Sequence, residues 1–184
     1  MRKIYFIRHG QTVWNTGYDS ETGTYLGKPI THDYNPSVFP EWLEMTKKGH
    51  EQAKRTAQTL TELVKNPSAI FSSEENRAIE TAKYSVNLFN SQLIKDSRLN
   101  EYEKGRGLEN DEQAFARINR FIEELIIAEH SISLIFSHQQ IISQYLSKKC
   151  KNFKKGIKNC EIIETEIRES GLVIVNRYFN HLDF

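Results

Sequence analysis

The fold of this chain is decided near its start, where the sequence reads Lys3-Ile4-Tyr5-Phe6-Ile7-Arg8-His9-Gly10. An unbroken run of apolar, aromatic and β-branched residues predicts a buried strand. Gly10 follows the run and allows the backbone to turn sharply. Arg8 and His9 are therefore placed at the carboxyl end of a strand, where open α/β sheets hold their ligands.

The composition is that of an ordinary globular protein. The chain has 184 residues, 38% of them hydrophobic and 27% charged, with a formal net charge of +1. This balance argues against a general affinity for nucleic acids or membranes, so any anion site must be local. Cys150 and Cys160 form no Cys-x-x-Cys pair, which favours reduced thiols. Apolar runs are too short for a secretory signal or a membrane span, and we expect a cytoplasmic protein.

The chain length predicts a single domain spanning residues 1–184. Glycines, prolines and aromatic residues crowd the segment after the first strand. We expect it to form a long loop insertion at about 16–45. A loop of this length in a compact domain is usually functional or disordered, and its aromatic residues favour an ordered loop packed on the body.

Strand and helix patterns alternate along the rest of the chain. Short apolar runs predict strands at 69–71, 93–94 and 133–136, and a hairpin of two strands at 161–167 and 172–178. Helical periodicity begins at Thr46 and returns over 111–128 and through Ile141 and Tyr145. The fold class predicted from this order is α/β, a three-layer α/β/α arrangement with a mostly parallel central sheet and a C-terminal antiparallel hairpin.

One further helix is expected after the second strand. Ser72-Ser73-Glu74-Glu75 has the Ser-x-x-Glu form of a capping box. This pattern predicts the start of a helix that carries Arg77 in its first turn.

Three of these strands are followed directly by polar residues. Arg8 and His9 follow the first strand, Ser73 and Arg77 follow the second, and His138 follows the strand at 133–136. Right-handed crossovers place the carboxyl ends of parallel strands at one edge of a sheet. We therefore expect these side chains to meet, although they lie far apart in the sequence.

Two histidines and two arginines at one strand edge suit a phosphoryl group. Arg8 and Arg77 can stabilise the charge on its oxygens, since a guanidinium offers a planar fork of donors. A neutral His9 can act as the nucleophile, and His138 can donate a hydrogen bond to the transferring group. The histidines show no spacing typical of metal ligands, so we expect no metal and no other cofactor.

Phosphoryl transfer from an ester also needs an acid that protonates the leaving oxygen. The candidates after Arg77 are Glu101, Glu103 and Glu109. Each would have to remain protonated near neutral pH, about 2 units above the ordinary pKa of a glutamate. Burial or the charge of a bound phosphate could raise the pKa, whereas two arginines would lower it. The chemistry of the residues alone does not choose among the three.

Five motifs in order carry a resemblance to a known family. They are Arg8-His9-Gly10-Gln11-Thr12-Val13-Trp14-Asn15, Thr46-Lys47-Lys48-Gly49-His50-Glu51-Gln52-Ala53, the segment from Ser72-Ser73 through Arg77-Ala78 to Thr81-Ala82, Leu99-Asn100-Glu101 with Gly105, and Phe136-Ser137-His138. They resemble RHGxTxxN, TxxGxxQA, SSPxxRAxxTA, LxExxxG and VSHGG. The chain is thus similar to the histidine phosphatase superfamily, also called the phosphoglycerate mutase-like family.

The resemblance implies a role for each matching residue. His9 would form a covalent phosphohistidine, with Arg8, Arg77 and His138 completing the phosphate pocket. Glu101 would protonate the leaving oxygen and then activate the incoming water. Asn15 would be a further phosphate contact, with Thr12 in support.

The chain also departs from the family pattern at two places. Glu74 stands where the family usually has proline, and Gln139-Gln140 replace the two glycines that follow the second histidine. We expect bulkier side chains at these positions to narrow or redirect the pocket, and we include Gln139 among the candidate substrate-binding residues.

The implied activity is that of a metal-independent phosphomonoester hydrolase, a histidine acid phosphatase-type enzyme. Its substrate would be a phosphorylated small molecule or a phosphoprotein. One alternative is a phosphoglycerate mutase, which returns the phosphoryl group to a reoriented intermediate. The other is a phosphate-binding protein whose catalytic site is vestigial.

Overall fold

The computed structural model describes residues 2–16, 43–102, 109–154 and 156–179. Its elements in chain order are β1 (Arg2–Arg8), α1 (Val13–Thr16), α2 (Lys47–Leu63), β2 (Ala69–Ser72), α3 (Asn76–Phe89), β3 (Leu93–Lys95), the 3₁₀ helix η2 (Ser97–Leu99), α4 (Asp111–Ile127), β4 (Ile132–Ser137), α5 (Gln139–Lys149), β5 (Ile162–Arg168) and β6 (Gly171–Tyr178). The predicted insertion at about 16–45 lies almost wholly outside the described residues, as does Glu103.

The central sheet has six strands in the order β3-β2-β4-β1-β5-β6. The pairs β2–β3, β2–β4 and β1–β4 are parallel, whereas β1–β5 and β5–β6 are antiparallel. The predicted α/β fold with a C-terminal hairpin is confirmed. Arg8 lies opposite Ser137, and Ser72 lies opposite Phe136. This register brings the carboxyl ends of β2, β4 and β1 to the same edge.

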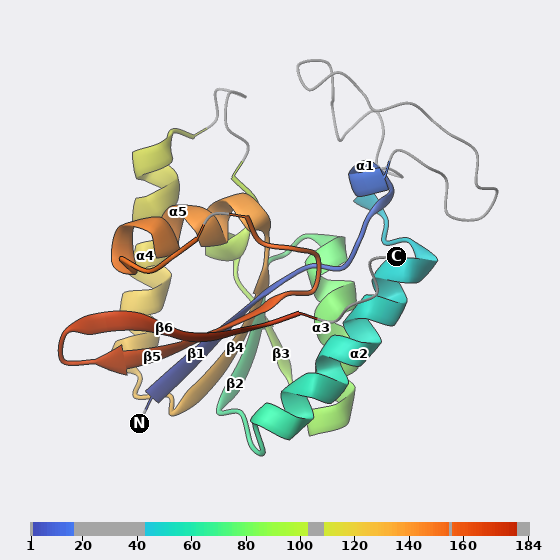
Figure 1. Ribbon diagram of the computed structural model, residues 1–184, viewed down its shortest axis with the longest axis horizontal. Coiled ribbons are helices and arrows are strands. Elements are labelled where there is room, and N and C mark those ends of the chain that lie inside the picture. Colours follow the sequence, from blue (N-terminus) through green and yellow to red (C-terminus); the bar gives the residue numbers. More distant parts are fainter. Residues whose placement is uncertain (1, 17–42, 103–108, 155, 180–184) are drawn as a thin grey trace.

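Helices cover both faces of the sheet (Figure 1), with α2 and α3 on one side and α4 and α5 on the other. The strand β1 contributes side chains to the hydrophobic core on each face of the sheet, because successive side chains of a strand point to opposite faces. Ile4 and Phe6 join the core beneath α4 and α5, while Tyr5 and Ile7 join the core beneath α2 and α3. All four side chains are buried. This sandwich makes the strand edge a rigid support for the residues that follow it.

The predicted capping box at Ser72 is wrong. The helix α3 begins at Asn76, and its N-cap residue is Glu75, which makes no side-chain capping bond. Ser72 still belongs to β2, and its hydroxyl donates to the Ser73 carbonyl at 2.8 Å. The local pattern fails for two reasons. Ser72 is part of β2, and the Glu75 carboxylate pairs with Arg77 and the Glu101 backbone N–H instead of the start of the helix. Arg77 nevertheless lies in the first turn of α3, as predicted.

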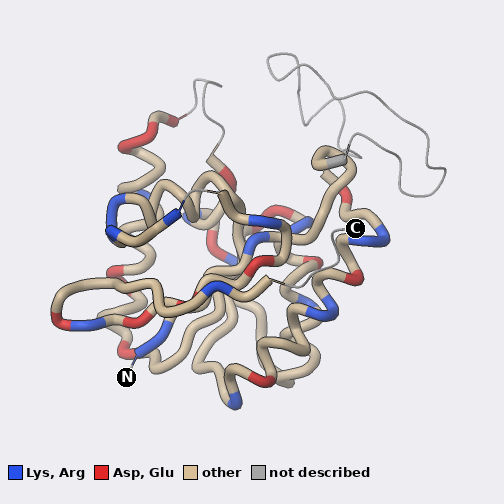
Figure 2. The backbone as a smooth tube through the Cα atoms, in the orientation of Figure 1, with Lys and Arg blue, Asp and Glu red and all other residues tan. Residues whose placement is uncertain are grey.

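Acidic and basic residues are interspersed over the helices and the hairpin of the described chain (Figure 2). Within those residues, no helix is both long and apolar enough to cross a membrane.

Candidate active site

The strand edge brings the predicted histidines and Arg77 together in the interior. The imidazole rings of His9 and His138 lie with their centroids 5.2 Å apart. His9, Arg77 and His138 are 5%, 8% and 0% exposed. Burial, followed by the charge of Arg77, lowers the pKa of both histidines. Three side chains from three separate segments therefore share one buried site, as the topology predicted.

The tautomer of His9 is fixed by the backbone next to it. Its Nδ1 lies 2.7 Å from the carbonyl oxygen of Gly10. A carbonyl can only accept, so Nδ1 carries the proton and Nε2 keeps its lone pair. Burial, together with the charges of Arg77 and Arg8, holds the pKa of His9 well below its ordinary value. His9 is thus a neutral imidazole with an unprotonated Nε2, the state that nucleophilic attack requires.

His138 is oriented by the residue that follows β2. Its Nε2 lies 2.7 Å from the hydroxyl oxygen of Ser73, and its Nδ1 has no hydrogen-bond partner among the described residues. Burial, followed by the charge of Arg77, lowers the pKa of His138 well below its ordinary value. A buried ring nitrogen without a partner is costly, and a bound ligand could relieve that cost.

Arg8 lies between the site and a neighbouring cavity. One guanidinium nitrogen, Nη1, donates to the Ile157 carbonyl at 2.7 Å, and its buried Nε has no partner in the described part of the chain. Arg8, Lys158 and Gln139 are among the residues that line a cavity of about 310 Å³. The predicted substrate residue Gln139 therefore lies beside Arg8, at the start of α5.

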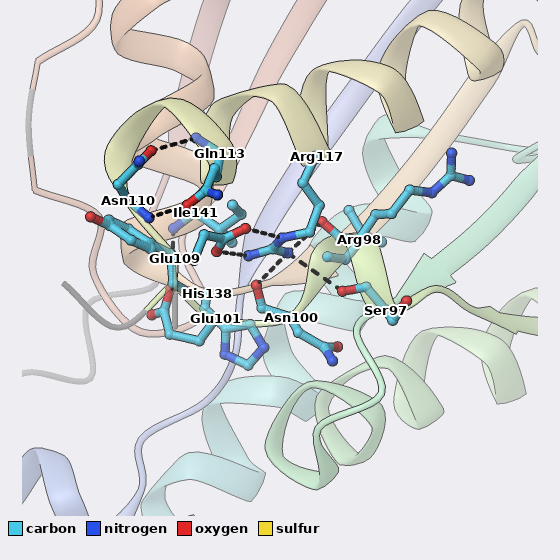
Figure 3. Close-up of polar contacts among 12 residues, drawn as sticks. Ser97, Arg98, Asn100, Glu101, Glu109, Asn110, Gln113, Arg117, His138 and Ile141 are labelled. Atoms are coloured by element: carbon cyan, nitrogen blue, oxygen red, sulfur yellow. Dashed lines mark hydrogen bonds and ion pairs between the residues drawn. The ribbon is translucent and has the colours of Figure 1, made fainter. Parts of the chain in front are cut away.

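Glu101 lies against the first turn of α5. Its Oε1 accepts the backbone N–H groups of Tyr102 at 2.9 Å and Ile141 at 3.1 Å, and its Oε2 accepts that of Gln140 at 3.4 Å. Figure 3 shows Glu101, His138 and Ile141 in this arrangement. Burial raises the pKa of Glu101 from 4.5 to about 7, while the three backbone bonds and Arg77 act in the opposite direction. Such a group can hold a proton near neutral pH and release it.

Arg117 fixes the segment that leads into Glu101 (Figure 3). From α4, its Nη1 donates to the carbonyl oxygens of Arg98 at 2.8 Å and Asn100 at 3.0 Å. Its Nε and Nη2 each donate at 2.7 Å to the Glu109 carboxylate. Glu109 is therefore engaged by Arg117, whereas Glu101 accepts from the backbone that follows His138. The two candidate acids that the structure describes thus have different partners.

The turn after β1 is held by the start of α2. Thr46 caps the helix by accepting the Gly49 N–H at 3.0 Å, and its own N–H donates to the Gln11 carbonyl at 2.9 Å. A Cβ on Gly49 would lie 2.1 Å from the Gln11 carbonyl oxygen, and one on Gly10 would lie 2.5 Å from that of Gly49. The two glycines are therefore needed because the backbones touch.

The predicted phosphate contacts Thr12 and Asn15 close the same loop. Asn15 Oδ1 accepts from the Thr12 backbone N–H at 3.0 Å and from its hydroxyl at 3.1 Å. Asn159 donates to that oxygen and to the His9 carbonyl, both at 3.1 Å. Since the Asn15 oxygen is used within the loop, its NH₂ group is the part that could donate to a phosphate.

Sequence reasoning missed Glu75. Its Oε2 lies 2.5 Å from Arg77 Nη2, and its Oε1 lies 3.4 Å from His138 Nε2. The Ser-x-x-Glu pattern predicts only a local capping role for Glu75, and no local pattern marks it as a partner of His138.

Comparisons with known proteins find similar sequences over part of this chain. Residues 41–108 match the profile of the histidine phosphatase superfamily (branch 1). A 2,3-bisphosphoglycerate-dependent phosphoglycerate mutase from Corynebacterium kroppenstedtii is 30% identical over 108 residues, which cover 56% of this chain and 36% of that protein. Over this part of the chain, the sequence is similar to the histidine phosphatase superfamily.

Several solved structures share the fold across nearly the whole chain. A mycobacterial glucosyl-3-phosphoglycerate phosphatase complexed with VO3 superposes with a TM-score of 0.71 at 18% identity, covering 95% of this chain and 96% of that one. The protein histidine phosphatase SixA complexed with tungstate gives 0.66 at 13% identity, covering 95% of both chains. These likenesses establish the fold. The match to the mutase covers only about a third of that relative's length.

Residues that could bind a metal are not clustered in the part of the chain that the structure describes. In the described ranges, no group of three or more histidine, cysteine, aspartate or glutamate side chains is placed to hold a metal ion. Cys150 and Cys160 are buried free thiols. Burial raises the pKa of Cys160 to about 12, so this thiol remains protonated beside the site.

Proposed function

We propose that this protein is a phosphomonoester hydrolase that works through a covalent phosphohistidine on His9. The observation that carries the proposal is the His9 tautomer: Nδ1 donates to the Gly10 carbonyl, and Nε2 is left unprotonated next to two arginines. A nucleophile in this state needs no separate base.

The first step is phosphoryl transfer to the enzyme. Arg8, Arg77 and His138 hold the phosphoryl oxygens, and the His9 Nε2 lone pair forms a bond to phosphorus while the ester P–O bond breaks. The departing oxygen takes the electron pair of that bond and a proton from Glu101, whose pKa of about 7 suits a general acid. Fixed cations that face the phosphoryl oxygens supply most of the stabilisation in such reactions.

The second step returns the enzyme to its starting state. The ionised Glu101 takes a proton from water as that water attacks phosphorus. The P–N bond breaks, and its electron pair returns to His9 Nε2. Inorganic phosphate leaves, and Glu101 is again protonated. Arg8 and Arg77 supply the positive charge that a metal ion would otherwise provide, and the neutral His138 ring supplies a hydrogen bond, so the proposed reaction is metal-independent.

The proposal is tested by trapping the phosphoenzyme. Brief reaction with ³²P-labelled phenyl phosphate followed by denaturation should give an acid-labile, base-stable label on the wild type and none on His9→Ala. His130→Ala is the matched control, because His130 lies next to the amino end of β4, at the opposite edge of the sheet. Turnover should survive EDTA. Equal labelling of the wild type and His9→Ala would contradict the proposal, as would activity that EDTA removes and a divalent ion restores.

Phosphoglycerate mutase activity is the second candidate, since the curated relatives matched here bear that name. A mutase must retain the phosphoryl group until the intermediate has reoriented. Incubation with 3-phosphoglycerate distinguishes the two, because a hydrolase releases inorganic phosphate faster than it forms 2-phosphoglycerate. The reverse order would favour the mutase, and no turnover of any phosphomonoester would favour a vestigial binding protein.

A further inference from the structure

The Glu75 carboxylate lies where the proposed reaction needs a phosphoryl group. Its Oε2 pairs with Arg77 Nη2 at 2.5 Å. Its Oε1 lies 3.4 Å from His138 Nε2 and accepts the Glu101 backbone N–H at 2.5 Å. One anionic group thus pairs with the guanidinium, accepts from the backbone of the proposed proton donor and lies next to the second imidazole, whose Nε2 also contacts the Ser73 hydroxyl.

We propose that Glu75 is an internal ligand of the phosphate site, which occupies Arg77 and His138 when the site is empty and is displaced by the phosphoryl group of the substrate. This inference rests on the proposed function. A carboxylate and a phosphoryl group both present negatively charged oxygens to a guanidinium fork. Since Arg77 Nη2 and His138 Nε2 face Glu75, a phosphoryl group cannot use the same donors until Glu75 leaves.

The site gives Glu75 freedom to move and holds its partners in place. Its side chain is 26% exposed, whereas those of Arg77 and His138 are 8% and 0% exposed. Glu75 precedes α3 and also lines a cavity of about 630 Å³, together with Glu44, His50 and other residues. Rotation about its own side-chain bonds can therefore carry the carboxylate away from the site without a change in the backbone.

The internal ligand has a cost and a benefit. A buried guanidinium without an anion is unfavourable, so Glu75 stabilises the empty site. A phosphoryl ligand binds only those molecules in which Glu75 has left Arg77. The apparent affinity is therefore the intrinsic affinity multiplied by the fraction of such molecules. After hydrolysis the carboxylate can return to Arg77 and assist the release of inorganic phosphate. Glu75 therefore sets the affinity of the site for substrate and product alike.

The test compares Glu75→Gln with Glu74→Gln. Both variants remove one negative charge before α3, but Glu74 is exposed and its side chain makes no contact with Arg77 or His138 among the described residues. Binding of inorganic phosphate and orthovanadate is measured by calorimetry. We expect about tenfold tighter binding in Glu75→Gln and less than about twofold change in Glu74→Gln. The KM for phenyl phosphate should fall with the phosphate constant, without a rise in kcat.

Glu75→Asp separates contact from charge. The shorter carboxylate keeps the charge but cannot reach Arg77, His138 and the Glu101 N–H together, so its phosphate affinity should move toward that of Glu75→Gln. Equal affinities in the wild type and Glu75→Gln would overturn the proposal, as would equal gains in Glu75→Gln and Glu74→Gln. Unfolding of both Glu75 variants in saturating phosphate would also overturn it, by showing that the carboxylate is a structural anion.

The two proposals fail in different ways. Tighter phosphate binding by Glu75→Gln without His9-dependent turnover would contradict the hydrolase and leave the internal ligand standing. Turnover through His9 with unchanged phosphate binding in Glu75→Gln would contradict the internal ligand and leave the hydrolase standing.

Discussion

At the scale of single residues, the reactive states in this site come from contacts with the backbone. The Gly10 carbonyl fixes the proton of His9 on Nδ1, and the N–H groups of Gln140 and Ile141 bind the Glu101 carboxylate. Backbone groups are effective for this purpose because the fold fixes their positions before a substrate arrives. Burial then shifts the two pKa values in the directions that the proposed chemistry needs.

The raised pKa of Glu101 predicts the pH dependence of activity. As pH rises through about 7, Glu101 loses its proton and phosphorylation of His9 should slow. Glu101→Gln should abolish this alkaline limb, and it should reduce kcat/KM by about 100-fold or more for alkyl phosphates. The loss should be smaller for p-nitrophenyl phosphate, whose leaving group departs without protonation. The measurement is kcat/KM for both ester types from about pH 5 to about pH 9. An equal loss for both types would exclude Glu101 as the acid.

At the scale of elements, α2 acts as a support for the turn that carries His9. The Thr46 cap and Gly49 touch Gln11, and the Gly10 N–H donates to the Thr81 hydroxyl of α3 at 2.9 Å. The Thr81 hydroxyl in turn donates to the Arg77 carbonyl at 2.7 Å. The motifs at the starts of two helices therefore position the residues that follow β1, although they lie far away in the sequence.

Gly49→Ala tests this support. The added Cβ would lie 2.1 Å from the Gln11 carbonyl oxygen, so either the turn or the helix must shift. We expect a loss of about 1–3 kcal/mol in the free energy of unfolding and a fall in kcat/KM of at least tenfold. Urea denaturation and initial rates provide the two measurements. Gln58→Gly, at an exposed position of the same helix, is the control, and it should lose stability while retaining most of its activity.

At the scale of the whole molecule, the buried site makes stability depend on pH. The native pKa values of His9 and His138 lie well below the ordinary 6.5. Below that pH the unfolded chain therefore binds more protons at these histidines than the native protein does. Glu101 acts in the opposite direction, since its native pKa of about 7 exceeds the ordinary 4.5. Its contribution is present below about pH 4.5 and is lost as pH rises through about 7.

Two histidines outweigh one glutamate, so the free energy of unfolding should fall on acidification. Between about pH 6 and about pH 5 the net slope should approach 1.4 kcal/mol per pH unit, the value for one proton. Urea denaturation across this range measures it. His138→Gln should flatten the slope, whereas His130→Gln should leave it unchanged. A slope in His138→Gln as steep as that of the wild type would contradict this account.

Most of the fold and much of the site could be predicted from the sequence because local patterns carry them. The run before Arg8 predicts β1, and the spacing of Ile118, Phe121, Ile122 and Leu125 predicts the inner face of α4, where all four are buried. The handedness of crossovers then brings His9, Arg77 and His138 to one edge. The predicted capping box at Ser72 was wrong because a local sequence pattern does not take into account that Ser72 pairs with a neighbouring strand as part of β2.

The sequence by itself therefore determined the elements, their order and the edge at which the polar residues meet, since periodicity and chain handedness are local properties. Only the tertiary structure decided that Glu101 binds the backbone after His138 while Glu109 pairs with Arg117. It also decided which nitrogen of His9 is unprotonated, and that Glu75 pairs with Arg77 and lies beside His138. Each of these depends on which distant atom a buried side chain meets, and burial and hydrogen bonding take effect only once the chain has folded.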